Sequence, residues 1–360
     1  MKLGICSSQL LLAVLSARLF PAPAASFVPV NATYSGLFYE TNGSWQQSSG
    51  FITLTTTARS KYSAKFQLGA ERLSLSGQLD STGKATGQVL RHYETPLTVQ
   101  LQVDSQDPDL VVGSVSDGNW TANLFADRGV FDGRTRLSTD AGQYTMIIPG
   151  DFTSTNTPGG ESYGTITITK SGGLFFAGVL ADGTKVTQST RVSKGGQWPF
   201  YPALYGGDGS LYGWMLFNGS TNEDLSGDVT WIKPEVPSTW AYPGGFAVVA
   251  TAWGSRFTRP PAGANILNLT RGHVEFNGGE LDQGLTNYFT LDSRNRITSL
   301  SANKLSLTFS LSNGSFSGRV MHPITWEWIP FKGVVLQRYG VAAGYFPGWT
   351  QTGDVWLEGD

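Results

Sequence analysis

Cysteine is almost absent from this chain, because Cys6 is the single cysteine among its 360 residues. Cys6 lies inside an N-terminal stretch with the features of a secretory signal, so we expect the exported chain to contain none. That absence excludes disulfides, thiol catalysis and thiolate-bound metals from the exported form. Cys6 also precedes the apolar run of the signal, whereas a lipid-anchored cysteine would follow it.

Charged residues are scarce as well. They make up 14% of the chain, against about 25% in an average soluble domain, and the formal net charge is −2. A nucleic-acid partner requires a concentrated basic face. We therefore expect no nucleic-acid partner.

Residues that carry catalytic or metal chemistry are few and scattered. The three histidines are His92, His273 and His322, which form no close pair and no HExxH motif. No G-x-S-x-G elbow occurs. The acidic stretches "DSQDPD" (Asp104 to Asp109) and "NEDLSGD" (Asn222 to Asp228) do not fit the D-x-D-x-D-G calcium loop. We predict no metal site and no cofactor.

Apolar runs are too short to cross a bilayer. "LLLAVL" (Leu10 to Leu15) follows Lys2 and precedes "APA" (Ala22 to Ala24), the pattern of a signal peptide over residues 1–24. No later run could form a spanning helix, so we expect no membrane-spanning segment in the mature chain. Export without disulfides predicts a secreted, periplasmic or cell-surface protein of a bacterium.

Helical periodicity is almost absent past the signal, and alternation of apolar and polar residues takes its place. It is clear in "FITLTTT" (Phe51 to Thr57), "LTVQLQV" (Leu97 to Val103) and "LSLTFSL" (Leu305 to Leu311). Period-two alternation bounded by Gly, Asn and Asp predicts strands, and turns such as Asn313-Gly314 predict tight hairpins. Strands joined by such short links must be antiparallel neighbours.

Glycine is the abundant residue, with 45 copies. When Ala is not counted as apolar and Pro is not accepted as a spacer, an apolar residue, a spacer, glycine, a spacer and an apolar residue occur together eight times, starting at Tyr34, Leu75, Val111, Phe176, Leu211, Leu225, Phe316 and Phe331. Chance would give about four. Glycine between two bulky residues on one strand face permits the curvature of a small barrel, or leaves a gap that a facing aromatic fills.

Similar hairpins recur along the chain. "ITLTTTARSKYSAKF" (Ile52 to Phe66) aligns without a gap with "ITITKSGGLFFAGVL" (Ile166 to Leu180). "SLTFSLSNGSFSGRV" (Ser306 to Val320) follows the same plan with its apolar alternation shifted by one residue, so its turn must differ.

These patterns predict an all-β fold of tandem antiparallel β-meander modules, closed or nearly closed barrels of about eight strands each. Two larger sandwiches remain an alternative, because periodicity does not distinguish closed from open sheets. The expected division is a signal peptide (1–24), module 1 (25–136), module 2 (137–235), a Pro-rich linker (236–263) and module 3 (264–360). The linker contains "FAVVATAW", which could add a strand.

Aromatic residues are the remaining surplus, with 11 Trp, 13 Tyr and 20 Phe. Our ligand-binding candidates come from the two densest stretches, "WEW" and "QWPFYPALYG", and are Trp326, Trp328, Trp198, Tyr201 and Tyr205. Side chains two apart on a strand form a flat row that could stack on sugar rings. The structural alternative is that they fill or cover the barrels, and exposed aromatic strips would favour the ligand interpretation.

Acid pairs for glycoside hydrolysis are spatial and so cannot be excluded from the sequence. The acids near the aromatic stretches are Glu275, Glu280 and Asp282 in "VEFNGGELD" and Glu327 in "WEW". In a strand, Glu327 would face away from both neighbouring tryptophans. We expect these acids to be solvated on outer sheet faces and predict no catalytic residue.

Several stretches resemble β-rich modules near the C-termini of large secreted bacterial proteins: "GLFYE", "VSKGGQWPFYPALYGGDGSLYGW", "LSGDVTWIKP", "FSGRV" and "FKGVVLQRYGVAAGYFPG". The resemblance covers most of the mature chain and implies export and β-structure, but no activity. The strand count is also similar to lipocalin-like and transferrin-binding-lobe barrels, a fold analogy that carries no function by itself.

The sequence therefore predicts a non-enzymatic secreted or cell-surface β-module protein with a binding or structural spacer role. Its partner is unknown, and a surface glycan or a protein would both fit. The alternative is a carbohydrate-binding or carbohydrate-active protein that uses exposed aromatic strips.

Overall fold

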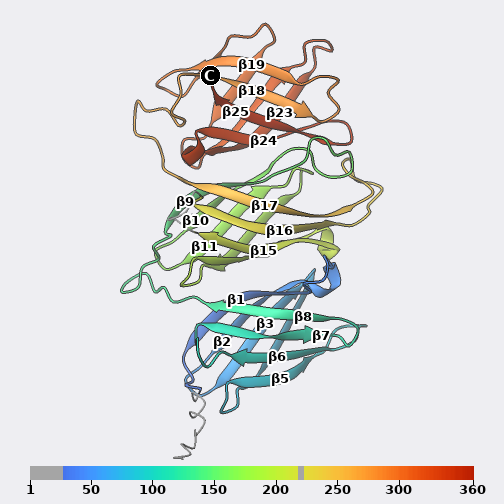
Figure 1. The fold of residues 1–360 in the computed structure, drawn as a ribbon, viewed down its shortest axis with the longest axis vertical. Coiled ribbons are helices and arrows are strands. Elements are labelled where there is room, and N and C mark those ends of the chain that lie inside the picture. The colour runs from blue at the N-terminus through green and yellow to red at the C-terminus, as the bar shows by residue number, and fades with distance from the viewer. Residues whose placement is uncertain (1–26, 218–222) are drawn as a thin grey trace, which may run out of the picture.

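The computed structural model describes residues 27–217 and 223–360 as three antiparallel sheets stacked along one long axis (Figure 1). The predicted signal peptide, residues 1–24, lies outside the described residues. Helical structure in the described part is limited to three 3-10 turns of three residues each, η1 (Gln46–Ser48), η2 (Tyr205–Gly207) and η3 (Gln337–Tyr339). The all-β prediction is confirmed.

The first sheet is a nearly closed barrel of eight strands in the order β4-β3-β2-β1-β8-β7-β6-β5. Side chains close the seam between β4 and β5, where a Cβ on Gly87 would lie 2.9 Å from Leu75 Cδ1. The strands are β1 (Ala32–Tyr39), β2 (Gly50–Thr56), β3 (Lys61–Leu68), β4 (Glu71–Gln78), β5 (Lys84–Val89), β6 (Leu97–Val103), β7 (Leu110–Ser116) and β8 (Thr121–Arg128).

The second barrel follows the order β12-β11-β10-β9-β17-β16-β15-β13, with β14 paired to β15. Its last strand, β17, lies inside the range 236–263 that we expected to be a linker, and it pairs with both β16 and β9. The strands are β9 (Gly142–Ile148), β10 (Ser162–Ile168), β11 (Gly173–Val179), β12 (Lys185–Arg191), β13 (Gln197–Phe200), β14 (Ala203–Leu204), β15 (Gly209–Phe217), β16 (Leu225–Lys233) and β17 (Phe246–Phe257).

The third barrel has the order β20-β19-β18-β25-β24-β23-β22-β21, so its seam follows the third strand instead of the fourth. The shifted copy of the repeated hairpin forms β21 and β22, after the seam, whereas the other two copies form β2–β3 and β10–β11, before it. The strands are β18 (Arg271–Gly278), β19 (Leu285–Leu291), β20 (Ile297–Ser299), β21 (Leu305–Phe309), β22 (Ser315–Met321), β23 (Trp328–Leu336), β24 (Val341–Pro347) and β25 (Thr352–Gly359).

Each barrel has its own apolar core. The alternation in β3 (Lys61–Leu68) buries every second side chain and exposes most of the others, which is the pattern of a strand with one face toward a core and one toward water. Three filled barrels explain the sequence pattern, and the alternative of two sandwiches is wrong.

The recurring glycines all lie within strands and allow close packing. A Cβ on Gly36 would lie 2.0 Å from the backbone oxygen of Phe125 on the neighbouring strand β8, and one on Gly318 would lie 2.4 Å from Phe331 Cζ. Either distance is far inside van der Waals contact. The glycines therefore permit the close approach of strands and rings that a narrow barrel requires.

The two joints between barrels are buried. Six of the eight positions of β1 are buried, and its outward residues Leu37 and Tyr39 pack against Tyr212 of the second barrel. At the other joint, Ile147 of β9 packs against Val334 of β23. A strand that is buried on both faces marks a packed interface rather than a flexible linker.

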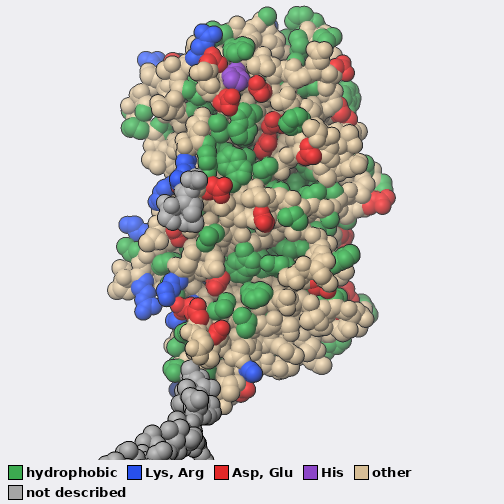
Figure 2. All heavy atoms as spheres, in the orientation of Figure 1, with side chains coloured by type: hydrophobic (Ala, Val, Ile, Leu, Met, Phe, Trp, Pro, Cys, Tyr) green, Lys and Arg blue, Asp and Glu red, His purple; other side chains and the backbone are tan. Residues whose placement is uncertain are grey.

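The surface shown in Figure 2 consists mainly of uncharged polar side chains and backbone, with acidic and basic side chains in small groups. Over the described residues, no helix has the length and apolar character needed to cross a membrane.

Candidate functional site

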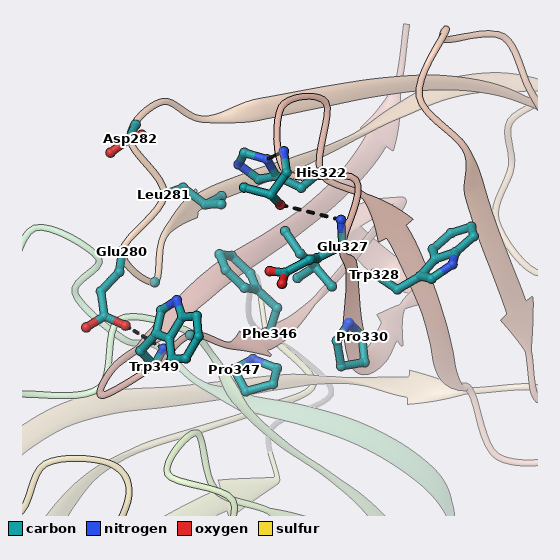
Figure 3. A pocket seen from close by; sticks show the side chains of 14 residues that line it. Glu280, Leu281, Asp282, His322, Glu327, Trp328, Pro330, Phe346, Pro347 and Trp349 are labelled. Atoms are coloured by element: carbon teal, nitrogen blue, oxygen red, sulfur yellow. Dashed lines mark hydrogen bonds between the residues drawn. The ribbon is translucent and has the colours of Figure 1, made fainter.

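A pocket of about 330 Å³ opens at one end of the third barrel. It lies where three connections meet: the β18–β19 loop, the β22–β23 hairpin and the β24–β25 loop (Figure 3). The side chains that bear on its chemistry are Glu280, Asp282, Glu327, Trp328, Phe346 and Trp349.

Glu280 fixes the two loops to each other. Its Oε2 accepts hydrogen bonds from the backbone N–H groups of Trp349 and Thr350, the latter at 2.9 Å, and its Oε1 accepts one from Thr350 Oγ1 at 2.6 Å. Burial opposes ionisation, but these bonds outweigh it and hold the pKa of Glu280 below its usual value. A carboxylate held ionised in this way is a loop anchor and not a proton donor.

The β22–β23 hairpin presents two tryptophans to solvent. The Trp326 side chain is 70% exposed and sits in the turn with φ +61°, and Trp328, the first residue of β23, is 38% exposed. The Arg319 guanidinium lies 4.3 Å from the ring centroid of Trp328 and covers one of its faces. Because Trp326 precedes the strand, the two indoles are not the flat in-strand row that the sequence suggested.

Trp349 is the aromatic residue that sequence reasoning missed. It follows Pro347 and Gly348 in the β24–β25 loop and is 82% exposed. The sequence could have indicated its exposure, because it follows a Pro-Gly turn and belongs to no alternating strand pattern. A tryptophan in such a turn has no core position to fill. In Figure 3 it lies across the pocket from Trp328.

Glu327 points into the pocket, whereas the Trp328 indole extends the other way (Figure 3). This opposite orientation is the one expected from alternation along a strand. Glu327 itself lies just before β23, in the turn of the hairpin, where its backbone oxygen accepts a hydrogen bond from the His322 N–H at 2.8 Å. The structure thus brings Glu280, Asp282 and Glu327 to one pocket. Glu275 lies elsewhere, 3.6 Å from His273 on the outside of β18.

Trp198 has a structural role. It is fully buried in the second barrel, with its ring centroid 4.6 Å from that of Phe200, and its Nε1 donates to Gln188 Oε1 at 2.9 Å. A side chain with no exposed surface offers nothing to a ligand. The tryptophan of the "QWPFYPALYG" stretch therefore fills a barrel, which was the structural alternative.

The hydroxyl groups of Tyr201 and Tyr205 also form hydrogen bonds within the protein. The Tyr201 hydroxyl donates to Ser49 O and accepts from the Gly69 N–H, both at 3.0 Å, and burial raises the pKa of Tyr201 to about 12. The Tyr205 hydroxyl donates to Asp182 Oδ2 at 2.6 Å and accepts from Trp231 Nε1 at 3.0 Å. Of the five candidates, Trp326 and Trp328 are the two that face solvent, and Trp328 lines the pocket.

The acidic loop from Asp104 to Asp109 forms a turn and ion pairs. Asp104 accepts from the Gln106 N–H at 2.7 Å, and Asp109 pairs with Arg128 at 3.3 Å and with Lys194 at 3.1 Å. In the second acidic stretch, Asp224 accepts from the Arg256 N–H at 2.8 Å, and Asn222 lies outside the described residues. Within residues 27–217 and 223–360, no group of three or more His, Cys, Asp or Glu side chains has the geometry to hold a metal ion.

Comparisons with known proteins do not assign the chain. No family model and no curated protein match it. Among solved structures, it is similar to intact Ap-TbpB with its N and C lobes (TM-score 0.23, 9% identity, covering 94% of this chain and 78% of that one). For a double mutant of transferrin binding protein B from Haemophilus parasuis Hp5, the TM-score is 0.24 and the identity 8%, over 94% of this chain and 77% of that one. For transferrin binding protein B from serogroup B Neisseria meningitidis, the TM-score is 0.22 and the identity 10%, over 94% of this chain and 78% of that one. Similarity at this level assigns neither a family nor a function.

Proposed function

We propose that this chain is a non-enzymatic binding protein of the cell surface or extracellular space, and that the pocket of the third barrel binds carbohydrate. The observation that carries the proposal is the exposure of three tryptophans at one end of the third barrel. Trp328 and Trp349 line the pocket, and Trp326 is exposed in the hairpin that leads into Trp328. Trp198 and Trp231, in contrast, are buried in a barrel.

Exposed indoles are unfavourable in water unless a ligand covers them, since a tryptophan buries a large apolar area when it is covered. The apolar faces of sugar rings suit such a surface, and their hydroxyl groups can donate to carboxylates such as Glu327 and Asp282 at the rim. A few polar groups around an apolar surface are typical of ligand pockets.

Hydrolysis is less well supported than binding. A glycosidase requires one carboxyl group that keeps its proton as a general acid. The hydrogen bonds from Trp349 and Thr350 lower the pKa of Glu280 and oppose that role. Asp282 and Glu327 lie in an open pocket, and no hydrogen-bond or ion-pair partner for either carboxylate is found within the described part of the chain.

Secretion remains part of the proposal and rests on the sequence of residues 1–24. The resemblance to β-rich modules near the C-termini of large secreted bacterial proteins supports the same location. Mass spectrometry of the exported protein tests both: an N-terminus after Ala24 supports the proposal, and a cell-retained chain that keeps residues 1–24 contradicts it.

The binding proposal is tested on a glycan array with the purified protein, followed by titration calorimetry with the best ligand. We expect Trp326→Ala, Trp328→Ala and Trp349→Ala each to weaken binding tenfold or more, about 1.4 kcal/mol. Trp45→Ala is the matched control, because Trp45 is 50% exposed on the first barrel, away from the pocket. An array without specific signals, or equal losses in the control, would contradict carbohydrate binding.

A spacer role is the second candidate, and the buried joints favour it. Leu37 and Ile147 are each fully buried where one barrel meets the next, so the three barrels form a continuous rod. Small-angle X-ray scattering should then fit one elongated shape. An ensemble of independently moving barrels would contradict a rigid spacer.

A further inference from the structure

The joint between the second and third barrels brings one acidic side chain from each barrel together. The segment that enters β10 crosses β24 and β25 so closely that a Cβ on Gly159 or on Gly160 would lie 2.4 Å from a backbone oxygen of β25. The next residue, Glu161, donates its backbone N–H to Gly344 O at 3.1 Å. The backbone thereby places the Glu161 side chain inside the interface.

There the Glu161 carboxyl group meets that of Asp354 on β25. The two residues are 9% and 7% exposed, and their carboxyl groups lie within hydrogen-bonding reach of each other. The Asn277 side chain lies near Asp354 as well and opposes the rise in its pKa. Glu161 Oε2 and Asp354 Oδ1 are buried and have no hydrogen-bond partner.

A hydrogen bond between two carboxyl groups requires a proton on one of them, because two carboxylates are acceptors only. Two ionised groups in this position would repel each other in a buried site where water cannot screen the charges. A single shared proton removes one charge and supplies the donor.

No cation within residues 27–217 and 223–360 compensates this pair. Among the described residues, neither carboxyl group forms an ion pair. The titratable groups on the elements packed around it are Glu275 on β18, Tyr345 on β24, Lys332 on β23, Tyr163 on β10 and Tyr242 before β17. Lys332 is directed to Tyr345, with its Nζ 5.2 Å from the ring centroid, and Glu275 adds further negative charge near Asp354.

We infer that Glu161 and Asp354 share one proton, and that this proton is required for tight packing of the second barrel on the third. The inference does not depend on the ligand of the pocket. Burial is the largest cause that raises the pKa of each group, and the facing carboxyl group adds to it for Glu161. A raised pKa in the folded state means that the stabilisation is complete below the ordinary values of 3.8 and 4.5 and is lost as the pH rises through the raised pKa.

The first experiment measures thermal unfolding of the whole chain from pH 4 to pH 9. We expect the melting temperature of the wild type to fall as the proton is lost. Glu161→Gln should remove this part of the pH dependence, because its amide donates to Asp354 at every pH. Glu235→Gln is the control, since Glu235 is exposed in a loop of the second barrel. Identical pH profiles for the wild type and Glu161→Gln would overturn the inference.

The second experiment measures the joint directly with spin labels at exposed positions on the two barrels, Thr167→Cys on β10 and Ser306→Cys on β21, in a Cys6→Ser background. The distance distribution should be narrow at acidic pH and broaden at alkaline pH, and it should stay narrow when Glu161→Gln is added. If that variant does not fold, the spin-labelled protein with the native Glu161 is sufficient for the test. A distance distribution that does not change with pH would overturn the inference. Restoration of a narrow distribution at alkaline pH by calcium would also overturn it, since a cation and not a proton would then bridge the carboxylates.

Discussion

The hydroxyl group of Tyr201, in the second barrel, accepts a hydrogen bond from the backbone N–H of Gly69, in the first, at 3.0 Å. The same hydroxyl donates to Ser49 O, so one side chain satisfies two backbone groups of the neighbouring barrel. The joint is therefore held by specific polar contacts in addition to the packing of Leu37 and Tyr212.

Tyr201→Phe should destabilise this joint by about 1–3 kcal/mol, because it leaves a buried N–H and a buried C=O without their partner. Denaturant unfolding measures the loss, and exchange of the Gly69 amide should accelerate. Tyr93→Phe is the control, since Tyr93 is 95% exposed. An unchanged Gly69 exchange rate would show that the bond does not form in solution.

Gly36→Ala should destabilise the first barrel by about 1–3 kcal/mol, the range for overpacking a tight site. Its Cβ would lie 2.0 Å from Phe125 O, so β1 and β8 would have to separate. Gly244→Ala is the matched control because its Cβ would have no neighbour within 4 Å. Chemical denaturation of both variants checks the prediction, and equal stabilities would refute the close-approach role of the recurring glycines.

Glu280→Gln should loosen the β24–β25 loop beside the pocket. The amide offers one acceptor oxygen where the carboxylate offers two, so hydrogen exchange at Trp349 and Thr350 should accelerate severalfold. Glu327→Gln, in the same pocket but without these bonds, should leave both amides unchanged. Equal hydrogen-exchange rates at Trp349 and Thr350 in the two variants would show that Glu280 does not anchor the loop.

Asp127→Asn should raise the stability of the first barrel near neutral pH relative to acidic pH. Burial, followed by the charges of Asp107 and Asp109, raises the pKa of Asp127 to about 6. A raised folded-state pKa gives stability that is complete below 3.8 and lost as the pH rises through about 6. After allowance for solvent screening, the loss is about 1–2 kcal/mol.

Unfolding of the wild type and Asp127→Asn at pH 4 and pH 7 measures this difference. Asp80→Asn serves as the control of opposite sign, because hydrogen bonds from the Lys84 backbone and from Thr82 lower the pKa of Asp80. The contribution of Asp80 to the stability of the wild type should be lost at acidic pH, as the carboxylate becomes protonated. A difference between wild type and Asp127→Asn that does not change with pH would contradict the raised pKa of Asp127.

The carboxyl pair and the pocket show why sites escaped sequence reasoning. Glu161 and Asp354 are 193 positions apart in the numbering, and nothing in either local pattern marks them as partners. Their contact depends on how the second barrel packs against the third. The pocket likewise depends on three loops that are separate in the sequence and that the strand order of the third barrel brings together.

The sequence alone determined the strands, since alternation and turn residues act over a few positions: the first barrel has the eight strands expected of one module. It also determined the curvature, because a glycine without a Cβ is needed wherever strands approach closely, as at Gly36. Tertiary structure alone decided which aromatics are buried and which exposed. Trp198 and Trp328 both occupy dense aromatic stretches, but burial depends on what packs against a side chain, and that is set by residues far away in the chain.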